Sequence, residues 1–272
     1  KQEGISYIAA GELPALIINC MRGGPGLGTI QPSQSDYFQA CKGGGHGDYH
    51  LIVLAPASVQ EMADFVGLGF ELAYKYRNPV MMLADGVVGQ MMERVKLPAP
   101  RPRRTDEEIA RQCPWAVTGR TGGRKPNIMT TLELVPQAME EHNLHLQEKY
   151  RLIEQNETRV EEHFTEDAEY LIVAFGCVAR ICHKAVEDAR AQGIKVGLLR
   201  PITLWPYPAE EIKRLGRQVK GILVVELNAG QMIEDVRLSL DRIIPVHHFG
   251  RMGGIVMDPD EVLVALKEKF EL

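Results

Sequence analysis

Short runs of apolar residues alternate with longer amphipathic segments along much of the chain. In its N-terminal third we predict strands at Ala15–Cys20, Leu51–Ala55 and Pro79–Ala84. A helix is predicted between the second and third strands, from the cap residue Ser58 to Tyr76, because Ser58 begins a capping-box pattern. Its apolar face includes Val66, Phe70 and Ala73. Fully apolar strands separated by helices are typical of a parallel sheet covered on both faces.

The C-terminal third repeats this alternation. Strands are predicted at 170–176, 195–200, 221–226 and 243–248, and helices at 177–192, 206–218, 232–240 and 258–270. Gly193 follows the first of these helices and is expected to cap it. About four strand–helix units in succession predict a small doubly wound domain.

The middle of the chain has a different pattern. The proline-rich residues 98–104 cannot sustain a helix or a central strand, and residues 115–126 have the composition of a loop. Residues 135–163 predict a charged helix, whose apolar contacts are Leu144, Tyr150, Leu152, Ile153 and Val160. We therefore predict an α/β protein with two doubly wound, mainly parallel domains, at 1–97 and 167–272, joined by a connector at 98–166.

Composition and charge narrow the classes of function. The formal net charge of −5 argues against nucleic acid as a partner, since phosphate binding needs a basic face. No apolar run has the length of a membrane helix, so we expect no membrane contact and a cytoplasmic location. The five cysteines form no C-x-x-C pair, which gives no sign of a zinc site or an iron–sulfur cluster in this chain. They are expected to be reduced and mostly buried.

The first ten residues have the pattern of a helix that lacks a cap before it. A chain that begins inside an element is expected to be truncated. Residues are therefore expected to be missing upstream of Lys1.

The densest candidate site is the segment Asn19–Thr29, which directly follows a predicted strand. Ligands bind at this end of the strands in open α/β sheets. Its four glycines allow close approach of a ligand, and Arg22 can hold a carboxylate with two hydrogen bonds. The segment is neither a Walker motif nor a dinucleotide fingerprint, and a purely structural loop is the equal alternative. Asp36, in the polar stretch that follows, can orient Arg22 or, as the simpler interpretation, cap the next helix.

Other candidates have weaker support, and for each the structural interpretation is favoured. His46 lies among glycines and is either a proton donor or part of a flexible turn. Asp85 with Gly86 is a functional carboxylate or a turn. Cys177 opens a helix and is either an activated thiol or a packed one. His247 and His248 are expected to be ordinary interior or surface histidines.

Two further stretches lie at strand ends. The rigid segment Arg200–Pro206 suits a subunit interface better than chemistry, and it is expected to be partly exposed. The segment Glu226–Met232 carries polar groups that can face a partner subunit.

Several motifs resemble one family. The run Gly11-Glu12-Leu13-Pro14, the sequence Met21-Arg22-Gly23-Gly24-Pro25 and the sequence Gln34-Ser35-Asp36-Tyr37 are similar to the first domain of 2-oxoacid:ferredoxin oxidoreductase α subunits. Residues 55–61 and 79–85 continue the match. Residues 197–206 and 225–232 are similar to the transketolase C-terminal-like domain of that family. The sequence from Arg22 to Thr29 resembles the branched-chain (2-oxoisovalerate) type most.

The resemblance implies oxidative decarboxylation of a 2-oxoacid with coenzyme A, with electrons passed to ferredoxin. It implies a pyrimidine-binding first domain for thiamine diphosphate, whose Mg²⁺ and diphosphate are shared with a partner subunit. Arg22, Gly23 and Gly24 are then the substrate-binding residues, and Thr29, Gln34, Asp36 and His46 are candidate rim residues. The activating glutamate is expected upstream, so no catalytic residue, metal ligand or assigned cofactor contact lies in this chain, and the fragment alone is expected to be inactive.

The implied partners are the β and γ/δ-type subunits, which carry the iron–sulfur clusters, together with ferredoxin and a second copy of this chain. Three alternatives stay open. They are a 2-oxoglutarate:ferredoxin oxidoreductase subunit, a dehydrogenase E1 β-type subunit, and a non-catalytic assembly module.

Overall fold

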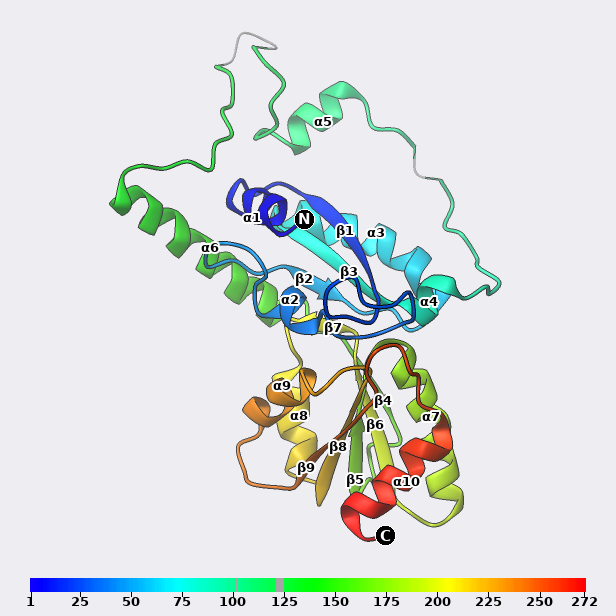
Figure 1. The fold of residues 1–272 in the computed structure, drawn as a ribbon. Coiled ribbons are helices and arrows are strands. Elements are labelled where there is room, and N and C mark those ends of the chain that lie inside the picture. The colour runs from blue at the N-terminus through cyan, green and yellow to red at the C-terminus, as the bar shows by residue number, and fades with distance from the viewer. Residues whose placement is uncertain (101, 121–124) are drawn as a thin grey trace.

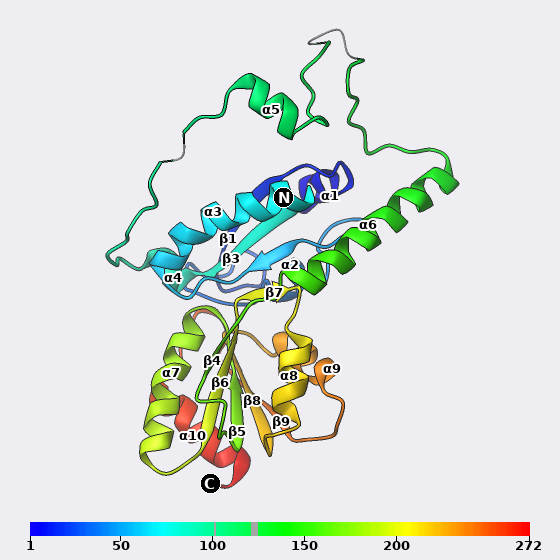
Figure 2. The ribbon, with the colours of Figure 1, turned by 180° about the vertical axis from the view of Figure 1, so that it is seen from behind.

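The computed structural model describes residues 1–100, 102–120 and 125–272, which form two α/β domains stacked one on the other (Figure 1). The first domain carries a four-stranded sheet and the second a five-stranded sheet. The view from behind shows the same two-part division (Figure 2). Most strand pairs are parallel, so the predicted fold class is confirmed.

The first sheet has the strand order β1-β3-β2-β7. Its strands are β1 (Ala15–Met21), β2 (Ile52–Leu54), β3 (Pro79–Asp85) and β7 (Thr203–Trp205). The first three are parallel, as the sequence predicts, and β7 is antiparallel to β2. Every residue of β2 and β3 is buried, which explains why both strands are apolar throughout.

Four helices belong to this domain: α1 (Gln2–Ala10), α2 (Tyr37–Cys41), α3 (Val59–Tyr76) and α4 (Gly86–Gln90). Ser58 caps α3 by accepting a hydrogen bond from the N–H of Glu61. The predicted apolar face of α3 is wrong in part, because Val66 and Phe70 are 39% and 48% exposed. The buried side contains Gly69, where a Cβ would lie 2.7 Å from Leu16 Cδ1. A glycine gives no hydrophobic signal, so its contact with the sheet was not visible in the pattern.

The connector contains α5 (Asp106–Gln112) and the long helix α6 (Pro136–Asn156). The predicted helix over 135–163 therefore ends earlier, and Val160 lies in a strand. Tyr150 and Ile153 are buried as predicted, but Leu144 and Leu152 are exposed. Arg101 and residues 121–124, which fall in the predicted loops 98–104 and 115–126, lie outside the described residues.

The second sheet has the strand order β4-β6-β5-β8-β9. Its strands are β4 (Val160–His163), β5 (Tyr170–Val173), β6 (Val196–Pro201), β8 (Gly221–Glu226) and β9 (Val246–Gly250). The antiparallel strand β4 lies at one edge, and the other four strands are parallel. All residues of β6 and β8 are buried.

Two pairs of helices cover this sheet (Figure 1). They are α7 (Gly176–Ala191) with α10 (Pro259–Phe270) on one face, and α8 (Ala209–Gly216) with α9 (Met232–Ser239) on the other. The arrangement is the predicted doubly wound one. Gly193 follows α7 with φ +83°, and its N–H donates to Arg190 O, as expected of a helix-ending glycine. No helix in the described ranges is both long and apolar enough to cross a membrane.

Two strands lie outside the predicted domain limits. The strand β4 falls in the predicted connector but pairs with β6, and β7 falls in the predicted second domain but pairs with β2 of the first sheet. The segment Arg200–Pro206, which contains β7, is accordingly buried between the two domains. Its predicted exposure was wrong, because its apolar side chains pack within the chain itself.

Candidate functional site

The Arg22 segment lies at the carboxyl edge of the first sheet. Met21 ends β1 beside Asp85, the last residue of β3, and Arg22 follows as the first residue of a loop that returns at Pro32. The parallel strands therefore place this loop where open α/β sheets bind ligands.

One edge of the Arg22 guanidinium is held by its own loop. Its Nη1 atom donates to the carbonyl oxygens of Leu27 and Thr29. The Nε and Nη2 atoms have no hydrogen-bond partner among the residues that the structure describes. Because Nε and Nη2 form the parallel pair of donors that binds a carboxylate with two hydrogen bonds, the anchored arginine keeps its carboxylate-binding edge free.

Glycines at two positions of the loop are required by close contacts. At Gly28, which has φ +59°, a Cβ would overlap the carbonyl oxygen of Gly23. At Gly23, a Cβ would lie 2.6 Å from Thr29 Cγ2 and 2.9 Å from the carbonyl carbon of Gly253. Gly23 is therefore the point where a turn of the second domain approaches the Arg22 loop.

A cavity of about 510 Å³ opens between the Arg22 loop and the second domain. The first domain contributes Arg22, Gly23, Gly24, Pro25, Gly26, Ser33, Ser35 and Asp36, and the second contributes Leu227, Asn228, Ala229, Gln231, Met252 and Gly253. The sequence predicted a cleft completed by another polypeptide. In the structure the second domain of the same chain supplies the facing wall. The sequence indicated this wall through the polar segment Glu226–Met232, but that segment was predicted to face a partner subunit.

The predicted rim residues are not all brought together at this cavity. Thr29 accepts the Arg22 hydrogen bond through its carbonyl oxygen and so supports the loop. His46 is exposed in a separate loop, where its carbonyl oxygen accepts from Ser6 Oγ, and it does not line the cavity. Of the four candidates, only Asp36 lines the cavity directly.

Gln34 is wholly buried between the domains, so its predicted place on the rim is wrong. Its Nε2 donates to Phe175 O at 2.8 Å, and its Oε1 accepts from Leu227 N at 3.1 Å. Its backbone N–H donates to Leu227 O, and its backbone carbonyl oxygen accepts from Asn228 Nδ2. All of its polar groups are therefore used to join the two domains, and none remains for a ligand.

Asp36 follows neither of the two predicted alternatives. It occupies the N-cap position of α2, but its side chain makes no capping hydrogen bond and forms no ion pair with Arg22 in the described part of the chain. Its Oδ2 accepts instead from Asn19 Nδ2 at 2.9 Å. The free edge of Arg22 is therefore not neutralised by the carboxylate next to it.

Asp85 is buried and joins two helices. Its Oδ1 accepts from the N–H groups of Val87 and Val88 at the start of α4, and its Oδ2 accepts from Cys177 N at 2.7 Å at the start of α7. The turn interpretation favoured by the sequence therefore describes only half of its role. The contact with Cys177 was not detectable, because the two residues are far apart in the sequence.

Cys177 is a packed thiol, as favoured from the sequence. It is buried, and burial together with the adjacent Asp85 carboxylate raises its pKa well above the usual value of a thiol. The start of a helix lowers a thiol pKa only where the thiolate is not desolvated. His248 is half-buried, with its Nε2 3.8 Å from Glu226 Oε1, and burial lowers its pKa.

Glu226 lies beneath the wall of the cavity. It is wholly buried at the end of β8, and it accepts from Asn228 Nδ2 and from the N–H groups of Gln231, Met232 and Ile233. It thus fixes the loop 227–231 to the start of α9. Burial nevertheless raises its pKa, because the loss of hydration outweighs these donors.

The raised pKa of Glu226 predicts a pH-dependent contribution to stability. Above pH 4.5, where the unfolded carboxyl ionises, the native state holds the proton more tightly. The free energy of unfolding contributed by this group therefore falls as the pH rises from 4.5 through the folded pKa. As the pH rises through this window, the free energy of unfolding of the wild type should fall relative to that of E226Q. Urea titrations of the two proteins at each pH measure this difference. A difference that is constant with pH would contradict the raised pKa.

The donor set of the cavity indicates what it can hold. Among the described residues that line it, Arg22 is the one cation and Asp36 is the one carboxylate, already bonded to Asn19. A Mg²⁺ ion with a diphosphate is held by more oxygen ligands than this set offers. The residues therefore fit a ligand with a carboxylate, and they do not fit the Mg²⁺–diphosphate part of a cofactor.

Fold and site together define a class, a two-domain α/β protein with an arginine-lined cavity between its domains. Residues 1–166 match the family model described as pyruvate flavodoxin/ferredoxin oxidoreductase, thiamine-diphosphate-binding, and residues 168–262 match pyruvate:ferredoxin oxidoreductase core domain II. The chain belongs to this family of thiamine-diphosphate-dependent 2-oxoacid:ferredoxin oxidoreductases. The family resemblance inferred from the sequence motifs is confirmed.

The relatives carry names of enzyme subunits. The chain is 48% identical to the ketoisovalerate oxidoreductase subunit VorB of Methanothermobacter marburgensis, over 98% of this chain and 74% of the relative. It is 33% identical to the 2-oxoglutarate synthase subunit KorA of Methanothermobacter thermautotrophicus, over 96% of this chain and 75% of the relative.

A solved structure has the same fold. It is a 2-oxoglutarate:ferredoxin oxidoreductase from Magnetococcus marinus with 2-oxoglutarate, coenzyme A and succinyl-CoA bound, and it matches with a TM-score of 0.81 and 25% identity. The match covers 98% of this chain and 50% of that chain. Both domains and their connection are therefore shared with that enzyme.

Proposed function

We propose that this chain is the subunit of a branched-chain 2-oxoacid:ferredoxin oxidoreductase that orients the 2-oxoacid. The reaction converts a 2-oxoacid and coenzyme A to acyl-CoA and carbon dioxide and passes two electrons to ferredoxin. The proposal depends on one observation, an Arg22 that lines the interdomain cavity while its guanidinium is anchored through Nη1 alone. The 48% identity to a ketoisovalerate oxidoreductase subunit supports the choice of substrate.

In this proposal Arg22 binds the carboxylate of the 2-oxoacid through Nε and Nη2. At Gly24 no atom lies within 4 Å of the position a Cβ would take, which leaves room for close approach of the acid to the backbone. Holding the carboxylate in one place also fixes the neighbouring 2-oxo carbon. The bound substrate then loses less orientational freedom on reaching the transition state, which lowers the barrier. Thiamine diphosphate, bound with a partner subunit, supplies the chemistry that accepts the electron pair when carbon dioxide leaves.

The cavity lining favours a branched-chain substrate over 2-oxoglutarate. A 2-oxodicarboxylate carries a second carboxylate, and Arg22 is the one cation among the described residues that line the cavity. Asp36 would repel a second anion there. The walls from the second domain include Leu227, Ala229 and Met252, which can cover a branched apolar side chain.

A 2-oxoglutarate enzyme is the second candidate, because KorA subunits are 32–33% identical to this chain over most of its length. It would need a second cation from another polypeptide at the cavity. Neither the E1 β-type subunit nor the assembly module explains the arginine with a free edge.

We propose further that the chain works in a cytoplasmic complex with subunits that hold the diphosphate and the iron–sulfur clusters, and that it pairs with a second copy of itself. The relatives are named as subunits, which supports a complex. All five cysteines are free and four of them are buried, as expected in a reducing compartment.

The test is a substrate panel on the complete complex. We expect the chain, co-expressed with its partner subunits, to reduce a viologen dye in a CoA-dependent reaction. The value of kcat/KM should be at least about 10-fold higher with 2-oxoisovalerate than with 2-oxoglutarate, since discrimination by apolar contacts is typically 10–200-fold. A preference for 2-oxoglutarate would overturn the choice of substrate. CoA-independent activity with a lipoyl acceptor would overturn the choice of enzyme.

A further inference from the structure

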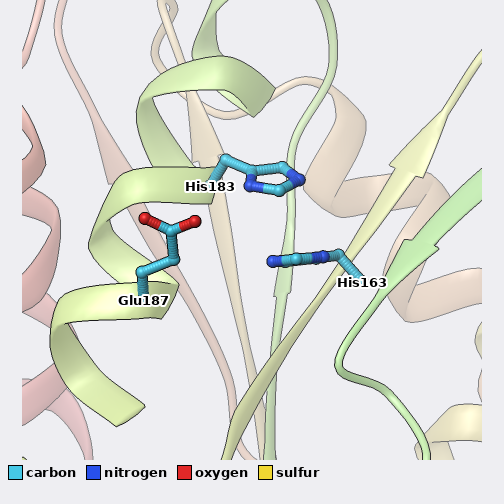
Figure 3. A group of neighbouring side chains, drawn as sticks. All are labelled: His163, His183 and Glu187. Atoms are coloured by element: carbon cyan, nitrogen blue, oxygen red, sulfur yellow. The ribbon is translucent and has the colours of Figure 1, made fainter. Parts of the chain in front are cut away.

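Two histidines and a glutamate meet between β4 and α7 in the second domain (Figure 3). His163 is the last residue of the edge strand β4, and His183 and Glu187 lie on α7. One ligand atom from each of the three residues can be chosen so that all three lie within 4.8 Å of one another. The side chains point into a common space between the strand and the helix (Figure 3).

The secondary structure explains why these side chains converge. His183 and Glu187 are four residues apart on α7, so they occupy the same face of the helix one turn apart. The antiparallel pairing of β4 with β6 places His163 opposite Leu198, at the edge beside this face. The His163 and His183 rings stack with their centroids 3.7 Å apart.

In the described part of the chain, the polar groups of this cluster form no hydrogen bond or ion pair. His163 Nε2 is buried and makes no hydrogen bond, which is costly for a polar atom. Within residues 1–100, 102–120 and 125–272, Glu187 forms no hydrogen bond or ion pair. Its neighbours on α7 do, because Asp188 pairs with Lys184 and Arg190 pairs with Asp167. A carboxylate and a buried imidazole nitrogen are thus left facing the same space.

We propose that His163, His183 and Glu187 bind one divalent transition-metal ion, for which Zn²⁺ is the best match. Two imidazoles and a carboxylate are a common zinc ligand set, whereas Mg²⁺ and Ca²⁺ prefer oxygen ligands alone. In a tetrahedral zinc site, ligand atoms lie about 3.3 Å apart, given metal–ligand distances of about 2.0–2.2 Å. To bind one ion, the His163 and His183 rings turn out of their present stack so that a nitrogen of each faces the ion, and a water molecule takes the fourth position.

The bound ion joins the edge strand to the helix layer. β4 directly follows the connector and is held to the sheet on one side only, through β6. A metal that links His163 to α7 fixes the end of this strand and covers an otherwise exposed edge. The site is therefore structural. It lies outside the Arg22 cavity, since none of its three residues lines that cavity.

Stacking alone gives a different expectation. Burial and the adjacent His183 ring lower the pKa of His163, which favours the uncharged form of that ring in the stack. Packed rings require neither the glutamate nor its charge. If Glu187 contributes to Zn²⁺ binding, the cluster is a metal site. If it does not, the two rings are only packed together.

The test measures Zn²⁺ binding by the full chain after treatment with a chelator. We expect one equivalent of Zn²⁺ by calorimetry and by elemental analysis. At 100-fold excess over Kd the ion should raise the unfolding midpoint by about 5 °C. His183→Ala and Glu187→Gln should each weaken binding by about 100-fold, as even the loss of an outer partner costs 10–100-fold. The matched control Asp188→Asn, one residue along α7, should bind like the wild type.

A Co²⁺ titration identifies the ligands independently of stability. We expect visible bands of a site with nitrogen and oxygen ligands, without the intense charge-transfer band that a cysteine thiolate gives. Equal Zn²⁺ affinity in wild type, H183A and E187Q would overturn the proposal, as would a thiolate band, which would place the ion at the exposed Cys20. An equal loss in D188N would show a general effect of helix charge and would also overturn it.

Discussion

Replacement of Arg22 by alanine is expected to lower kcat/KM of the complete enzyme for its 2-oxoacid by about 100-fold, a loss typical of mispositioned substrates. That factor corresponds to about 2.7 kcal/mol, the range of a hydrogen bond to a charged group. The physical reason is the Nε and Nη2 edge, which stays free for a carboxylate while the contacts of Nη1 with Leu27 and Thr29 anchor the guanidinium. The measurement is steady-state viologen reduction over a range of 2-oxoacid concentrations.

The division of this loss between KM and kcat is also predicted. The carboxylate is lost as neutral carbon dioxide, so its contact with Arg22 is strongest before the bond breaks. An interaction that binds the ground state at least as well as the transition state acts mainly on KM. We therefore expect the larger share of the effect of R22A in KM, with a smaller fall in kcat from poorer orientation.

Two variants serve as controls for R22A. Arg22→Lys keeps the charge but cannot bind a carboxylate with a planar pair of donors, so it should recover only part of the activity. Arg151→Ala removes an exposed arginine from α6, outside the cavity, and should leave activity unchanged. Normal turnover of R22A would show that the carboxylate is held elsewhere and that the substrate-binding assignment is wrong.

The order of strands and helices could be predicted because each element carries its own signal. Buried parallel strands such as β3 and β8 are apolar on both faces, and glycines or capping residues mark the ends of their helices. The faces of helices were harder to predict. In α3 one of the buried residues is Gly69, which contacts Leu16 of the sheet. In α6 a lysine, Lys149, is buried, with its ammonium group bonded to Glu12 and to Arg77 O. Such contacts bury a glycine or a lysine, which the hydrophobic pattern of the sequence does not mark as buried.

The candidate site could be predicted only where it is local in sequence. The Arg22 loop follows its strand directly, so its place at the carboxyl edge could be inferred. Its facing wall comes from residues about two hundred positions later in the chain, such as Asn228 and Met252. Gln34 was assigned to the rim because it is polar and near the loop. Nothing local shows that its side chain is hydrogen-bonded to Phe175 and Leu227 of the second domain.

The burial of Asp85 predicts the largest effect on stability. Asp85→Ala leaves three N–H groups without an acceptor, two of them buried, at Val88 and Cys177, and one partly buried, at Val87. Each buried donor left unpaired costs about 1–3 kcal/mol, so we expect a loss of about 4 kcal/mol in the free energy of unfolding. The measurement is urea unfolding followed by circular dichroism, with the slope of the transition compared between variants.

A series at the same position separates hydrogen bonding from packing. Asp85→Asn retains one carbonyl oxygen of similar shape, so it can serve α4 or α7 but not both, and about half of the loss is expected. Because Cys177 begins α7 in the second domain, hydrogen exchange should rise at the start of both helices in D85A and at only one of them in D85N. Asp188→Asn, in an exposed ion pair with Lys184, should cost no more than about 1 kcal/mol. If D85A were no less stable than D188N, Asp85 would not join the domains, and the wall opposite Arg22 would depend on other contacts.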